Sequence, residues 1–240
     1  PYPQGRRWER GVTRTAADTD AHFEWTLAAA RWLAKRNDIQ VTTLERCHAD
    51  HADPPGQWLT AAQIKTVARR ISKTFDFVKI GKTVLSAADA LYVLAQYVDS
   101  LLRDNRRPDA VQISRITGPV EQILIPRSAV TFKRQDLMLA ARQLVHHVNA
   151  NGRLPHALRA HSVDCGPGEL LLALAQALSG DRLPDTVTVE PTSGVPKCAE
   201  MDPFSKATAG SGHATPGYRP DQIHLQGWLQ SWSYRPATRV

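Results

Sequence analysis

Cysteine is scarce in this chain: only Cys47, Cys165 and Cys198 occur in 240 residues. They are too few and too far apart for a disulfide-stapled scaffold. No stretch approaches the roughly 18 consecutive apolar residues of a membrane-spanning helix. A glycine-rich phosphate loop followed by Lys-Ser/Thr is also missing. These absences predict a globular protein with no membrane span and no cofactor.

Acidic residues are outnumbered, since 30 Lys and Arg face 23 Asp and Glu and give a net charge of +7. Such a balance favours anionic partners, including nucleic acid, anionic wall polymers and acidic lipid surfaces. However, the chain has no compact run of basic residues and no recognisable nucleic-acid-binding motif. We therefore expect no nucleic-acid partner.

Internal similarity is the strongest positive signal. A shift of 80 residues lays SAADALYVLAQYV (86–98) on GPGELLLALAQAL (166–178), and RRPDAVQI (106–113) resembles DRLPDTVTV (181–189) at a shift of 76. The difference of four residues is about one helical turn, which keeps the helix face in phase. The pattern predicts a tandem repeat with copies at 60–113 and 136–189.

Each copy is expected to contain a helix, a turn and a short extended piece, and then the same three again. Thr60 is the expected cap of the first helix. Asn151-Gly152 and Pro155 are expected to end the helix that precedes them, and Asp164 to cap the next one, with Pro167 in its first turn.

We predict an α+β, mainly helical fold of helix-turn-short strand units in three segments. Residues 1–59 hold an N-terminal helix and loop, 60–189 the tandem repeat, and 190–240 a loop wrap with an aromatic C-terminal segment.

The stretch with Asn-Gly-Arg-Leu-Pro (151–155) between two apolar helices resembles the pseudomurein-binding repeat, a cell-wall-binding module of methanogen envelope proteins. The similarity is best over 136–178 and weaker over 60–113, where KTFDFVKIGK and DNRRP replace the motif. The resemblance implies non-catalytic binding of a wall glycan or peptide. It also implies an extracellular or cell-envelope location, with any signal peptide already removed from the opening PYPQGRRWERG.

Saccharide binding needs aromatic ring faces beside polar side chains. The candidate rings belong to Trp58, Trp228, Trp232 and Tyr234. The candidate polar residues lie at turns that we expect to be equivalent: Asn105, Arg106, Asn151, Arg153 and Arg182. The aromatic C-terminal segment is equally typical of a subunit contact, so a homo-oligomer, other envelope proteins as partners, and a structural subunit of a surface layer or filament stay open.

Cys165 suggests a catalytic alternative because it precedes an apolar helix, whose N-terminal dipoles lower a thiol pKa. This arrangement is similar to transglutaminase-like cysteine peptidases, and His213 is the candidate base for a wall-cutting peptidase or amidase. The competing interpretation is packing, because Cys165 aligns with Leu85 of the other copy.

A metal alternative rests on CHADHAD, which brings His48, Asp50, His51 and Asp53 close together beside Pro-Pro-Gly. No second cluster with ligand spacing follows. Solvated loop polarity explains the same residues, and we expect no metal.

Overall fold

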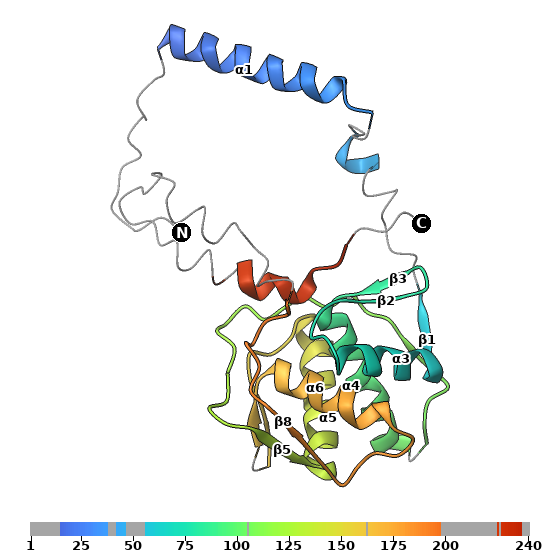
Figure 1. Ribbon diagram of the computed structural model, residues 1–240. Helices are drawn as coiled ribbons and strands as arrows, with labels where there is room; N and C mark the ends of the chain where they lie inside the picture. The colour runs from blue at the N-terminus through green and yellow to red at the C-terminus, as the bar shows by residue number, and fades with distance from the viewer. Residues whose placement is uncertain are drawn as a thin grey trace. The chain divides into compact units, whose positions relative to one another are not determined.

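The computed structural model describes residues 15–37, 42–46, 56–104, 106–161, 163–197, 225 and 227–236. The chain divides into two compact units, residues 1–50 and 51–240. The first unit contains α1 (Ala16–Ala34), blue in Figure 1, which begins where the Thr15 hydroxyl accepts a hydrogen bond from the Asp18 amide. No side chain of α1 is buried. The hydrophobic core lies in the second unit.

About half of the structure is helical, and its strands form four two-stranded antiparallel pairs. This confirms the predicted combination of dominant helices and short strands. Among the residues that the structure describes, no helix is both long and apolar enough to cross a bilayer.

Residues 58–112 form six elements in the order β1 (Trp58–Thr60), α3 (Ala61–Ile71), β2 (Val78–Ile80), β3 (Thr83–Leu85), α4 (Ala87–Asp104) and β4 (Ala110–Gln112). Thr60 caps α3 as predicted, and Gln63 returns a bond to the Thr60 amide, completing a capping box. The buried residues of α3 recur at helical spacing: Ile64, Val67, Ala68 and Ile71. β1 pairs with β4, and β2 with β3.

Residues 130–189 form six further elements: β5 (Val130–Lys133), α5 (Arg134–Asn151), β6 (Leu158–Ala160), β7 (Val163–Cys165), α6 (Pro167–Ser179) and β8 (Thr186–Val189). α5 ends as predicted, because Gly152 takes a left-handed conformation with φ of 67°. β5 pairs with β8, and β6 with β7.

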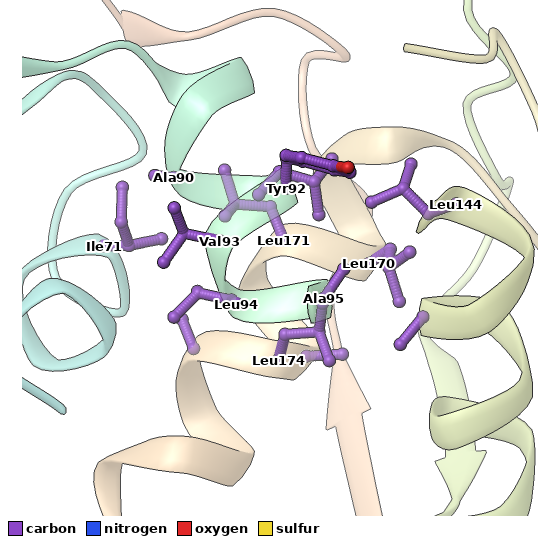
Figure 2. Packing of buried hydrophobic residues seen from close by; sticks show 14 of the residues in the cluster. Ile71, Ala90, Tyr92, Val93, Leu94, Ala95, Leu144, Leu170, Leu171 and Leu174 are labelled. Carbon is purple, nitrogen blue, oxygen red and sulfur yellow. The ribbon is translucent and has the colours of Figure 1, made fainter. Parts of the chain in front are cut away.

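The four helices α3, α4, α5 and α6 share one core. α3 packs chiefly against α6, and α4 against α5. Figure 2 shows Ile71, Leu94, Leu144 and Leu171, one from each helix, pointing into this shared core. Complete burial of a leucine side chain contributes about 1.5–3 kcal/mol, so no pair of helices is stable without the other pair.

Two buried carboxylates begin α4 and α6. Asp89 accepts hydrogen bonds from the Ser86 amide (3.0 Å) and the Ile116 amide (2.9 Å). Glu169 accepts them from the Gly166 amide (3.0 Å) and the Thr192 amide (2.8 Å). Each carboxylate therefore caps a helix and also fastens a segment that crosses it.

The prediction that Asp164 caps α6 is wrong. Asp164 lies in β7, and its carboxylate binds Arg159 across the hairpin at 2.8 Å. The cap position is Gly166, followed by Pro167, and Glu169 reaches back to the Gly166 amide.

The C-terminal segment docks on the same unit through a short 3-10 helix, η2 (Ser231–Ser233), red in Figure 1. The Trp232 side chain is fully buried, with its Nε1 donating to the Gly194 carbonyl at 2.9 Å. Its ring meets Phe75 edge-on, and the Gly118 amide donates to the Ser233 hydroxyl at 2.8 Å.

Candidate functional site

An exposed tryptophan stands at the edge of a polar hollow of about 350 Å³, here called the Trp58 groove. Trp58 begins β1 and its side chain is 58% exposed, whereas the next residue, Leu59, is buried. Alternate residues of a strand point to opposite faces, so the inward Leu59 directs Trp58 outward. The other lining residues come from α4, β4 and α5: Tyr92, Gln96, Asp99, Ser100, Arg103, Ala110, Val111, Gln112, Val145 and Asn149.

Ion pairs fix the charged part of the Trp58 groove. The Asp99 carboxylate lies 3.0 Å from Nε of Arg103 and 3.1 Å from Nε of Arg142. The Tyr92 hydroxyl donates to the Asn149 side chain. These contacts hold the α4 and α5 sides of the groove together.

Two amide side chains in the Trp58 groove keep their hydrogen-bonding capacity. Gln112 lies directly opposite Trp58 in the β1–β4 register, so the two side chains are neighbours on one face. Within the described ranges, the side-chain amides of Gln96 and Gln112 have no hydrogen-bond partner. The groove thus offers a ring face beside free amide donors and acceptors.

A second hollow, of about 470 Å³, contains one predicted binding residue, Arg182. Arg107 and Arg134 share it with Arg182, so three guanidinium groups gather there. Arg106, the neighbour of Arg107, is exposed and pairs with Asp109 at 3.6 Å. Asn105 lies outside the described residues.

The structure does not bring Asn151 and Arg153 to that hollow. Both are exposed at the C-terminal end of α5, whereas Arg134 begins this helix. An 18-residue helix spans roughly 27 Å. The Asn151 side chain donates to the His147 carbonyl at 2.9 Å and so serves the end of its own helix.

The C-terminal aromatic residues have different surroundings. Trp228 is 50% exposed and Tyr234 is similarly exposed, with the Tyr234 ring 6.0 Å from that of Phe77. Trp232, between them, is part of the core and presents no ring face to a ligand.

Cys165 lies on β7, opposite Leu158, and is buried. Burial, followed by the charges of Glu169 and Asp164, raises the pKa of the thiol to about 12. A nucleophilic cysteine needs the opposite shift. His213, the candidate base, lies outside the described residues.

The part of the chain that the structure describes contains no group of three or more His, Cys, Asp or Glu side chains suited to a metal ion. The candidate ligands His48, Asp50, His51 and Asp53 lie outside that part.

Comparisons with protein-family models, with curated proteins and with solved structures find no match to the chain. Trp58 and Arg182 were identified from the sequence, whereas Gln96, Gln112 and Arg134 were not. The one available signal was the alternation of Trp58, Leu59 and Thr60 before a helix cap, which marks Trp58 as outward-facing.

Proposed function

We propose that residues 51–240 form a non-catalytic module that binds a cell-wall glycan or peptide polymer through the Trp58 groove. The observation that carries the proposal is an exposed tryptophan ring beside amide groups without partners and a charged wall. A ring face contacts the C–H groups of a sugar while the polar groups bond its hydroxyls. The volume of about 350 Å³ also falls within the range of small-ligand sites.

The order of elements supports the repeat that underlies the family resemblance. In both halves the order is strand, helix, hairpin, helix, strand, and the first strand pairs with the last. A shift of 80 residues carries the first residues of β2, β3 and α4 onto those of β6, β7 and α6. We infer that the copies within 60–113 and 136–189 arose from one unit of the pseudomurein-binding kind, and that the protein acts outside the cell or in its envelope.

The test is retention of the protein on purified pseudomurein and peptidoglycan sacculi at low salt. We expect a Trp58→Ala variant to lose about tenfold or more in affinity, which corresponds to about 1.4 kcal/mol. Trp228→Ala is the matched control, because it removes another exposed tryptophan from outside the groove. The control is expected to bind like the native chain.

Absence of retention on either polymer would contradict the proposal. Equal binding by native protein and Trp58→Ala would do so as well. Circular dichroism of both variants separates a binding defect from misfolding.

A structural subunit of a surface layer or filament is the second candidate, supported by the half-exposed rings of Trp228 and Tyr234 on one docked segment. Aromatic residues are enriched in protein interfaces. This function requires self-association, so light scattering of the native chain should detect assemblies that a Trp228→Ala variant weakens. A monomer at all concentrations rules it out.

The third hypothesis, a cysteine peptidase or amidase, has no support from the surroundings of Cys165. A buried thiol with its pKa raised to about 12 remains protonated at neutral pH.

A further inference from the structure

The second hollow, of about 470 Å³, combines positive charge with an apolar base, and we call it the arginine cleft. Three guanidinium groups line it, from Arg107, Arg134 and Arg182. Leu101 of α4, Met138 of α5 and Leu183 complete the lining. No acidic side chain is among these six residues.

Two of the three arginines are held by the turn at 181–185. Arg107 donates to the Asp181 carbonyl. Arg134 donates from Nη2 to the Leu183 carbonyl at 2.8 Å and to the Asp185 carboxylate at 2.7 Å. Arg182 makes no hydrogen bond or ion pair with any residue that the structure describes. One guanidinium group is therefore available in full beside two whose positions are set.

The nearby acids leave a positive surplus. Asp181 pairs with Lys65 at 2.6 Å, and the Asp185 carboxylate that pairs with Arg134 is 93% exposed. Surface ion pairs of this kind are weak and exchange readily. Counting Lys65 and the three arginines against two aspartates, the local charge is +2.

Guanidinium groups bind carboxylates through paired, parallel hydrogen bonds. Phosphate matches the same groups, but a bare phosphate leaves Leu101, Met138 and Leu183 uncovered. A peptide whose last residue is aliphatic fills both parts, since its side chain covers the apolar base while its terminal carboxylate meets the arginines.

We propose that the arginine cleft binds the free C-terminal carboxylate of a peptide that ends in an aliphatic residue. This site is distinct from the Trp58 groove and goes beyond the proposed function. Arg182 provides the main contact to the carboxylate, and Leu183 and Met138 receive the aliphatic side chain.

Fluorescence anisotropy with a labelled Ala-Ala-Leu peptide tests the proposal. The full chain is expected to bind the peptide with a free carboxylate at least tenfold more tightly than the same peptide with a C-terminal amide. Arg182→Gln should weaken binding of the free acid about tenfold. Arg106→Gln is the matched control, because this nearby arginine is 78% exposed and does not line the cleft. It should bind like the native chain.

Equal affinity for acid and amide overturns the proposal, as does unchanged binding by Arg182→Gln. Competition by inorganic phosphate as effective as that of the unlabelled peptide also overturns it, because it indicates a general anion patch. Trp58→Ala should bind the peptide normally, so failure of this proposal and failure of the wall-binding proposal are separate results.

Discussion

The Cys165 thiol is kept neutral by its position between a hairpin and a helix. In the unfolded chain the thiol ionises with an ordinary pKa near 9.0, whereas in the folded chain this pKa is about 12. The folded state therefore retains a proton that the unfolded state loses between these values. The stabilisation is complete below about pH 9 and is lost as pH rises towards 12, at about 1.4 kcal/mol for each pH unit.

We expect this difference to appear in urea unfolding measured from about pH 8 to about pH 10.5. The free energy of unfolding of the native chain should fall more steeply than that of Cys165→Ala, which has no thiol at this position. Other titrating groups are common to both chains and cancel in the comparison. Parallel pH profiles would show that the folded thiol ionises normally.

At the same scale, the sequence predicted some residues well because their role is local or repeated. Cys165 was expected to pack because Leu85 holds the matching place, and both are buried in hairpins. The Trp58 groove was only partly predictable. Gln112 meets Trp58 through a strand pairing whose register is set by more than 50 intervening residues, and short-range spacing contains no trace of it.

At the scale of elements, the C-terminal segment depends on a close approach at Gly118. A methyl group there would overlap the Leu229 carbonyl oxygen and lie 2.9 Å from Trp232 Cβ. Both contacts belong to the segment that buries Trp232. Gly118 is thus the point where this segment and the chain between the two halves come closest.

Gly118→Ala should therefore destabilise the protein by about 1–3 kcal/mol, the usual cost of overfilling a packed contact. Gly227→Ala is the control within the same segment, because a Cβ at Gly227 meets nothing within 4 Å. Thermal unfolding measured by circular dichroism distinguishes them. An unchanged midpoint for Gly118→Ala would mean that the segment is not docked as described.

Elements were predicted unevenly for a physical reason. The helices and the extended pieces that follow them carry periodic apolar residues and clear end signals, such as Thr60 and Gly152. β1 and β5 have only three and four residues, which is too short for alternation to stand out. The cap of α6 was misassigned to Asp164 because a side chain two positions later, Glu169 reaching back to Gly166, supplies the bond.

At the scale of the whole molecule, every residue of the buried apolar core lies between Leu59 and Trp232. We therefore expect a fragment of residues 51–240 to fold alone, with a cooperative thermal transition. Its midpoint should agree with that of the full chain within a few degrees. A fragment that lacks near-ultraviolet circular dichroism, or that melts without cooperativity, would show that residues 1–50 are needed for this core.

The pairing of α3 with α6 and of α4 with α5 has a consequence for synthesis. Translation delivers the helices in chain order, so α3 and α4 leave the ribosome before either partner exists. Their apolar faces have no cover until about residue 179 has emerged. A nascent chain stalled after β4 is therefore a chaperone substrate, and the protein completes its fold only late in translation.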